Sequence, residues 1–263
     1  MKPDRRKFLK IAGISCFALA AGAGSLGASS KKVQAQIAPG RYVPRQEILK
    51  AKRWAMVIDT RLFPTAEDYF PLAQACRKAH NIPDIPGDQG IKWFWTDTYE
   101  HVFPDDMNNH LNEGMQKKAF PLLCNHCTNP PCVRVCPTQA TYKMPDGIVA
   151  MDYHRCIGCR FCMAGCPYGA RSFNFVDPRK YLPDPVPNPD FPTRMIGVVE
   201  KCTFCPERLS SGKMPACVEA SAGKVLFGDL EDAQSNVRRA LSANFSIRRK
   251  PALGTQPGVY YLI

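Results

Sequence analysis

The sequence lacks several features that mark common classes of protein. No Cys-x-x-Cys pair is followed by histidine, which excludes covalently attached haem c. No Gly-rich nucleotide loop and no nucleophile paired with a base stands out, so nothing indicates a substrate pocket. After residue 35, no apolar run approaches the ~18 residues needed to span a bilayer. What the chain of 263 residues does contain is cysteine, with 13 residues in all.

The cysteines are concentrated in one stretch, where eight of them lie between residues 124 and 166, in the runs CNHCTNPPCVRVCP and CIGCRFCMAGCP. The second run is Cys-x-x-Cys-x-x-Cys-x-x-x-Cys-Pro, the spacing of bacterial ferredoxins, and the first has two extra residues before its third cysteine. In such runs three cysteines curl around one [4Fe–4S] cluster and the fourth reaches the neighbouring cluster. We therefore predict two sets of ligands: set A is Cys124, Cys127, Cys132 and Cys166, and set B is Cys156, Cys159, Cys162 and Cys136.

Two other uses of cysteine fit this stretch poorly. Structural zinc needs separated pairs of cysteines and has no use for the crowded third and fourth positions. A disulfide framework suits small secreted chains with poor cores, and this chain is neither small nor poor in apolar residues, which make up 45% of it. His126 lies inside the first loop, and we interpret it as a supporting residue and not as a ligand.

The formal net charge of +12 first suggests a nucleic-acid partner, but its distribution argues against one. Residues 1–35 carry seven basic residues and one acidic residue, so this segment accounts for half of the excess. A [4Fe–4S]²⁺ cluster with four thiolates has a net charge of −2, and three of them would bring residues 36–263 to about zero. We predict no nucleic-acid partner.

Residues 1–35 read as a targeting segment. Arg5-Arg6-Lys7-Phe8-Leu9-Lys10 is a twin-arginine motif, and a mild apolar stretch rich in Ala and Gly follows it, as in twin-arginine (Tat) export signals. Cleavage is expected after Ala35, with a retained membrane anchor as the alternative. The chain is then expected in the periplasm, at the outer face of the cytoplasmic membrane, attached peripherally through its partners.

The first and last parts of the chain each contain an incomplete cysteine loop. After a predicted strand at residues 54–59, the first loop holds only Cys76, and the last loop holds Cys202, Cys205 and Cys217 but has Ser221 at its fourth position. If these two loops pair as the central two do, Cys76 is the fourth ligand of the cluster bound by the last loop. The cluster of the first loop would need three further cysteines there and one at position 221, and all four are absent. We predict set C, which is Cys202, Cys205, Cys217 and Cys76, and three [4Fe–4S] clusters in total. A buried Cys76 beside a zinc-binding last loop is the alternative.

The expected fold is α+β: tandem bacterial-ferredoxin-like modules, rich in loops, with short strands and helices. Its domain, residues 36–263, divides into a pseudo-repeat core at 119–180 and an outer module that joins 50–80 with 196–230. Further strands are predicted at 147–152, 172–175 and 225–229, and a terminal helix at 229–243. The aromatic run at 91–95 is expected in the core, with a docking surface as the alternative.

These residues resemble a known family along nearly the whole chain. The export signal, the paired loops and KCTFCPERLSSGKMPACVEA are similar to the electron-transfer subunits of dimethyl-sulfoxide reductase, polysulfide reductase and nitrite reductase (NrfC-like) systems, which usually carry four clusters. The chain departs from this four-cluster pattern at residues 61–76 and at Ser221, where ligand cysteines are missing. With these departures and the segments RWAMVIDTR, IKWFW and FGDLED, it looks closest to the DsrO-type subunits of DsrMKJOP complexes in dissimilatory sulfur metabolism.

The resemblance implies a non-catalytic subunit of an oxidoreductase complex. Its partners would be a quinone-interacting NrfD-like (DsrP-type) integral membrane subunit and a periplasmic multihaem cytochrome c (DsrJ-type). One alternative is the iron–sulfur beta subunit of a molybdopterin oxidoreductase such as polysulfide reductase. A second is a self-contained reductase in which one cluster has an open ligand position, and a third is a colourless, zinc-stapled protein.

Overall fold

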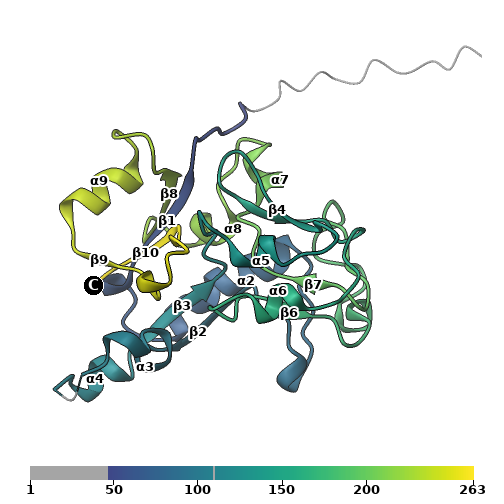
Figure 1. Ribbon diagram of the computed structural model, residues 1–263, viewed down its shortest axis with the longest axis horizontal. Helices are drawn as coiled ribbons and strands as arrows, with labels where there is room; N and C mark the ends of the chain where they lie inside the picture. Colours follow the sequence, from purple (N-terminus) through teal and green to yellow (C-terminus); the bar gives the residue numbers. More distant parts are fainter. Residues whose placement is uncertain (1–46, 109) are drawn as a thin grey trace, which may run out of the picture. The chain divides into compact units, whose positions relative to one another are not determined.

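Short strands and helices joined by long loops make up residues 47–108 and 110–263, which the computed structural model describes (Figure 1). The strands are β1 (Trp54–Asp59), β2 (Phe94–Thr98), β3 (Ala119–Leu123), β4 (Thr141–Lys143), β5 (Val149–Met151), β6 (Ser172–Phe173), β7 (Val199–Glu200), β8 (Val225–Asp229), β9 (Ser246–Ile247) and β10 (Val259–Leu262). The helices are α2 (Phe70–Ala79), α3 (Tyr99–Val102), α4 (Glu113–Gln116), α5 (Pro131–Arg134), α6 (Phe161–Ala164), α7 (Pro206–Leu209), α8 (Ala216–Ala220) and α9 (Asn236–Ala243). The predicted α+β class, rich in loops, is confirmed.

The largest sheet has the strand order β8-β1-β10-β9. The predicted strand at 54–59 is confirmed as β1, whose first five residues are buried because it lies between two neighbours. It pairs antiparallel with β8, with Val57 opposite Leu226, and parallel with β10, with Met56 opposite Val259. The strand prediction for residues 225–229 is thereby also confirmed. The parallel partner β10 was not predicted.

The remaining strands form three antiparallel pairs, and each pair leads into a cysteine loop. The pairs are β2 with β3, β4 with β5 and β6 with β7. β3 ends at Leu123, directly before Cys124, and β7 ends two residues before Cys202. The predicted strands at 147–152 and 172–175 are present in shorter form as β5 and β6. Because paired strands have little freedom, they fix the point at which each cysteine loop begins.

Most of the aromatic run at 91–95 lies in the core as predicted, whereas Trp95 is only partly buried at its edge. Trp93 is 1% exposed and Phe94 9% exposed, and both belong to the main hydrophobic core, as does Ile91. Several cysteines are members of the same core: Cys76, Cys124, Cys127, Cys202 and Cys217. The thiols thus lie in the middle of the apolar packing.

The terminal helix begins later than predicted. α9 starts at Asn236, and the Ser235 hydroxyl caps it by accepting a hydrogen bond from the Arg238 N–H at 3.2 Å. The expected start at Asp229 was wrong because that carboxylate accepts hydrogen bonds from the backbone N–H groups of Lys52 and Arg53, at 2.8 and 3.0 Å. In the part of the chain that the structure describes, no helix is both long and apolar enough to cross a membrane.

A buried ion pair ties the Pro-rich connection before β7 to the core. Arg194 Nε lies 2.8 Å from Glu200 Oε2, and the two side chains are 1% and 0% exposed. The Glu200 carboxylate also accepts hydrogen bonds from Trp93 Nε1 (3.0 Å) and Asn174 Nδ2 (2.6 Å). The guanidinium lies over the Trp93 ring and donates to the Asn81 carbonyl oxygen at 2.9 Å. The pair therefore joins residues that are more than 100 positions apart.

Replacing Arg194 with methionine is expected to destabilise the protein by about 3–5 kcal/mol, because it leaves the Glu200 carboxylate buried without a counter-charge. The midpoint of anaerobic urea unfolding would measure this loss. Lys117→Met is the control, since Lys117 pairs with Glu113 at the surface, where the two side chains are 73% and 84% exposed, and its loss should change the midpoint little. Equal midpoints for the two variants would contradict the importance of the buried pair.

Candidate metal centres

All four cysteines of set A line one hollow in the fold. Cys124 and Cys127 come from the loop after β3, Cys132 from α5, and Cys166 from the turn after α6. Burial raises the pKa of the Cys127 thiol to about 12, and the neighbouring Cys124 thiol adds to this effect. Thiols in such a place become thiolates only when a cation binds them, which is what a metal cofactor provides.

Two polar side chains beside set A have atoms without a hydrogen-bond partner among the described residues. Asn125 and His126 are 2% and 3% exposed, and Asn125 Nδ2, Asn125 Oδ1 and His126 Nε2 have no partner there. His126 Nδ1 accepts a hydrogen bond from the Val149 N–H at 3.0 Å, which leaves Nε2 as the protonated nitrogen. Unpartnered N–H donors beside the cysteines fit a cofactor that offers sulfur acceptors, as an iron–sulfur cluster does.

His126 is also held by packing. Its ring stacks on Phe204 with the ring centroids 3.7 Å apart and an angle of 15° between the planes. Burial lowers the pKa of His126 well below its usual value, and the nearby Lys201 ammonium lowers it further. The imidazole is therefore neutral. The structure places it between its own loop at 124–136 and Phe204 of the last cysteine loop.

The structure brings Cys76 to the three cysteines of the last loop. Cys76 lies on α2 and Cys217 on α8, and these two helices pack against each other. Burial raises the pKa of the Cys76 thiol well above its usual value, and the Cys202, Cys217 and Cys205 thiols, in that order, raise it further. All four of these side chains are buried. The members of set C therefore converge, although more than 120 residues separate Cys76 from the others.

A histidine and a carboxylate that the sequence analysis missed lie beside set C. His80 Nε2 lies 2.9 Å from Glu207 Oε1, and the two groups lie within 4.8 Å of the Cys205 Sγ. His80 Nδ1 lies 2.9 Å from the Cys76 carbonyl oxygen, one helical turn back. The i, i+4 spacing of Cys76 and His80 on a helix was the available signal, because it places both side chains on one face.

Set B is the most exposed of the three. Burial raises the pKa of Cys162 on α6, and the thiols of Cys132 and Cys156 contribute in the same direction. Cys136 follows α5, which packs against α6, and its own side chain is partly buried. Cys159 is exposed. The contacts thus connect Cys156 with Cys162, while Cys136 and Cys159 lie toward the rim of the loop.

The loop of set B depends on a glycine. Gly158 has a φ of +71°, and a Cβ at this position would collide with the carbonyl oxygen of Gly197. Only glycine combines this backbone conformation with so close an approach. The CIGC run therefore passes tightly against the segment that leads into β7.

Interactions between thiols also indicate the order of the sets. Burial and then the Cys124 thiol raise the pKa of Cys202, so sets A and C are neighbours. Cys132 of set A in turn raises the pKa of Cys162 of set B. Set A therefore adjoins both set C and set B.

Two buried cations accompany the thiols, and neither was predicted. Lys201 is 0% exposed, and its Nζ donates hydrogen bonds to the carbonyl oxygens of Val149 and, at 2.8 Å, of Cys202. Arg171 is 5% exposed and lines the hollow of set A. Their positions, directly before Cys202 and five residues after Cys166, were the only sequence signal. Buried positive charge suits a site that holds anionic clusters.

Ser221, which occupies the position where a further cysteine ligand would be expected, forms hydrogen bonds with the backbone instead. Its hydroxyl donates to the Val218 carbonyl oxygen at 2.7 Å and accepts from the Val225 N–H at 3.1 Å. The side chain therefore closes the end of α8 and connects it to β8.

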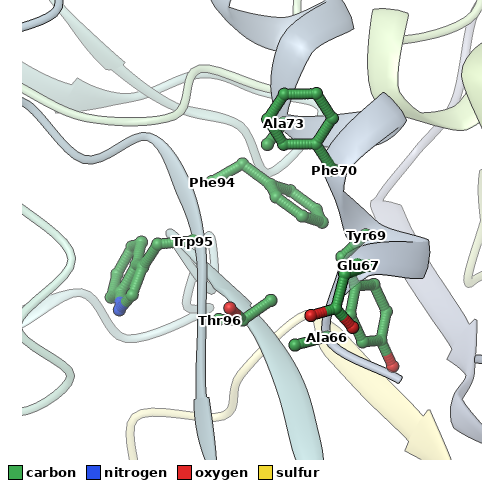
Figure 2. A pocket seen from close by; sticks show the side chains of 8 residues that line it. All are labelled: Ala66, Glu67, Tyr69, Phe70, Ala73, Phe94, Trp95 and Thr96. Atoms are coloured by element: carbon green, nitrogen blue, oxygen red, sulfur yellow. The ribbon is translucent and has the colours of Figure 1, made fainter. Parts of the chain in front are cut away.

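An apolar groove lies beside the helix of set C (Figure 2). Its lining comes from the start of α2, the turn before it and β2, and consists of Ala66, Glu67, Tyr69, Phe70, Ala73, Phe94, Trp95 and Thr96. Phe70 is 63% exposed. This lining offers one carboxylate and no thiol, imidazole or amine, so it suits contact with an apolar surface better than reaction chemistry.

The geometry defines a class of protein. The twelve cysteines among the described residues are all free thiols; those of sets A and C each come together, and those of set B lie on adjoining loops, a donor set typical of iron–sulfur or zinc binding. Residues 115–177 match the 4Fe-4S dicluster domain family. The chain is a ferredoxin-type protein that binds [4Fe–4S] clusters.

Relatives that match most of the chain define the class more narrowly. The chain is 38% identical to the Hdr-like menaquinol oxidoreductase iron-sulfur subunit 1 of Archaeoglobus fulgidus, over 98% of this chain and 97% of that protein. It is 39% identical to the iron-sulfur subunit of a putative dimethyl sulfoxide reductase of Halobacterium salinarum, over 71% of each. It is 36% identical to the menaquinone reductase iron-sulfur cluster-binding subunit of Nitratidesulfovibrio vulgaris, over 80% and 88%. The chain therefore belongs to the family of iron–sulfur electron-transfer subunits of membrane-associated oxidoreductases.

The predicted export signal at residues 1–35, including the boundary to the domain that follows, lies outside the described residues. It stays a prediction.

Proposed function

We propose that the chain carries three [4Fe–4S] clusters, bound by sets C, A and B in that order, and passes single electrons between two partners. When bound, each cluster supplies a one-electron carrier. The protein's own residues hold the thiolates in place, keep water away from sets A and C, and supply buried positive charge. The observation that carries this proposal is the convergence of Cys76 with Cys202, Cys205 and Cys217, which gives the last loop a fourth thiol.

For the biological setting we propose a DsrO-type subunit in the periplasm, at the outer face of the cytoplasmic membrane. Two relatives act, by their names, on menaquinol or menaquinone, which supports a quinone-interacting membrane partner of the NrfD-like (DsrP) type. A DsrJ-type multihaem cytochrome c would be the second partner, in dissimilatory sulfur metabolism. The twin-arginine motif at Arg5-Arg6 supports export of the folded protein with its clusters inserted.

Two exposed apolar surfaces support contact with two partners. Around the exposed Cys159 of set B, the side chains of Ile157 and Phe161 are 66% and 60% exposed. At set C, the groove of Figure 2 is lined in part by Phe70, which lies six residues before Cys76 and thus about 9 Å from it along the axis of α2. Since these surfaces adjoin the first and last sets in the order C, A, B, electrons can enter at one and leave at the other.

The test is the content of iron and acid-labile sulfide in anaerobically purified protein, with an EPR spectrum after reduction. We expect about twelve irons and about twelve sulfides per chain, because each cubane contains four of each. About eight irons, together with bound zinc, would show instead that the last loop binds a structural metal and would refute the three-cluster proposal.

A second candidate is the beta subunit of a molybdopterin oxidoreductase. Its support is the 39% identity to the iron-sulfur subunit of a putative dimethyl sulfoxide reductase. Purification of the intact complex separates the two candidates: a large molybdopterin subunit would favour this one, and a multihaem cytochrome c would favour the DsrO-type assembly.

A further inference from the structure

Arg171 is a buried cation that has no carboxylate partner among the described residues. Its side chain is 5% exposed, Nη2 donates to Thr141 Oγ1 at 2.9 Å, and Nη1 lies 3.9 Å from Met151 Sδ. None of the ion pairs formed within residues 47–108 and 110–263 includes Arg171. Arg194, which is equally buried, has Glu200 as its counter-charge. Arg171 must obtain its compensation elsewhere, because an isolated buried charge is costly.

The neighbours of Arg171 are thiols from two different sets. It lines the hollow with the four cysteines of set A, and Thr141 and Met151 place it beside the small core formed around Cys132 and Cys162. Burial by itself lowers the pKa of Arg171, but Cys132 of set A and Cys162 of set B raise it above its usual value. The guanidinium thus lies where sets A and B meet.

A guanidinium keeps its charge at every pH at which a protein is folded. The thiolates of both sets, with their clusters bound, are anionic, and the addition of an electron makes either site more negative by one unit. A fixed positive charge at the junction stabilises the more negative state on both sides. Its effect is large because the site is buried and little screened.

We propose that Arg171 is the counter-charge shared by sets A and B, and that it raises the reduction potentials of both clusters together. The inference rests on the proposed electron-transfer function. Arg171 binds no iron and acts only through its charge: it shifts both potentials in the same direction, so the difference in potential between the two sites changes little.

The test is a redox titration followed by EPR on the holoprotein, with Arg171→Met and Arg171→Lys. In Arg171→Met we expect two of the three midpoint potentials to fall, each by at least a tenfold change in the equilibrium constant for one-electron reduction, or about 59 mV. The third, that of set C, should stay near its wild-type value. Arg171→Lys keeps the charge and should retain most of both potentials. Thr141 Oγ1 still donates to the Ala150 carbonyl oxygen at 3.1 Å, so the methionine variant leaves that hydroxyl with a partner.

Arg134→Gln is the control for loss of one positive charge. Arg134 lies on α5, between Cys132 and Cys136 in sequence, but its side chain is exposed, so water and salt screen it and the potentials should change little.

Iron is counted in the same samples, so that a failure of the role proposed for Arg171 can be distinguished from a failure of the three-cluster proposal. Unchanged potentials in Arg171→Met at full iron content would overturn the role of Arg171 and leave the three-cluster proposal intact. If Arg171→Met loses iron, Arg171→Lys decides: full iron and near-wild-type potentials support the role of the charge, and iron loss there too overturns it. A wild-type content of about eight irons would contradict the three-cluster proposal itself.

Discussion

Replacing Cys76 with alanine is expected to lower the iron content from about twelve to about eight per chain. The reason is geometric: α2 is the element that delivers a fourth thiol to Cys202, Cys205 and Cys217, and the part of the chain that the structure describes offers set C no further cysteine. Iron and sulfide analysis of anaerobically purified protein measures the change. The loss of one EPR signal, with two retained, would assign it to one cluster.

Leu72→Ala is the matched control for general damage to α2. Leu72 is 2% exposed, one helical turn before Cys76, and its truncation should destabilise the fold by about 2–5 kcal/mol through a cavity. The folded fraction should nevertheless retain about twelve irons. An unchanged iron content in Cys76→Ala would show that Cys76 is an ordinary core thiol. Equal iron loss in both variants would show that set C responds to the stability of α2 and not to the ligand.

Removing the iron is expected to abolish most of the fixed tertiary structure. In thiolate metal sites the free energy of metal binding is largely folding free energy, on the order of 10 kcal/mol for a structural metal. Here Cys124 and Cys202 belong to the main core, so loss of the cofactor empties its centre. Loss of the anionic clusters would also leave Arg171 and Lys201 buried without the negative charge that compensates them.

Near-UV circular dichroism and amide hydrogen exchange of chelated, thiol-protected protein test this prediction. Exchange should increase most in the loops at 124–136 and 202–217. It should increase least around Val57, Val237 and Leu262, where α9 covers the main sheet with a small core that contains no cysteine. Reconstitution with iron and sulfide should reverse the change. An apoprotein with the same near-UV spectrum and exchange pattern as the holoprotein would contradict a structural role for the clusters.

Short-range features of this protein were predicted from the sequence because they depend on the local reach of the chain. The spacing from Cys124 to Cys136 and from Cys156 to Cys166 is a local requirement for curling three thiolates around one cube, so sets A and B could be proposed without a structure. β1 and β8 were predicted for a similar reason, since runs of apolar residues must be buried wherever they occur. The start of α9 was wrong, because the Asp229 carboxylate binds backbone groups of the distant residues Lys52 and Arg53.

The twelve cysteines and their local spacing determined by themselves that this chain is a ferredoxin-type iron–sulfur protein. Only the tertiary structure decided which charges accompany the thiols. Arg171, Lys201 and the His80–Glu207 pair reach the cysteine sets through contacts between segments far apart in sequence, and no local pattern encodes such contacts. Charge compensation in a buried site depends on which groups are close in space, and that distance is set by the packing of the whole chain.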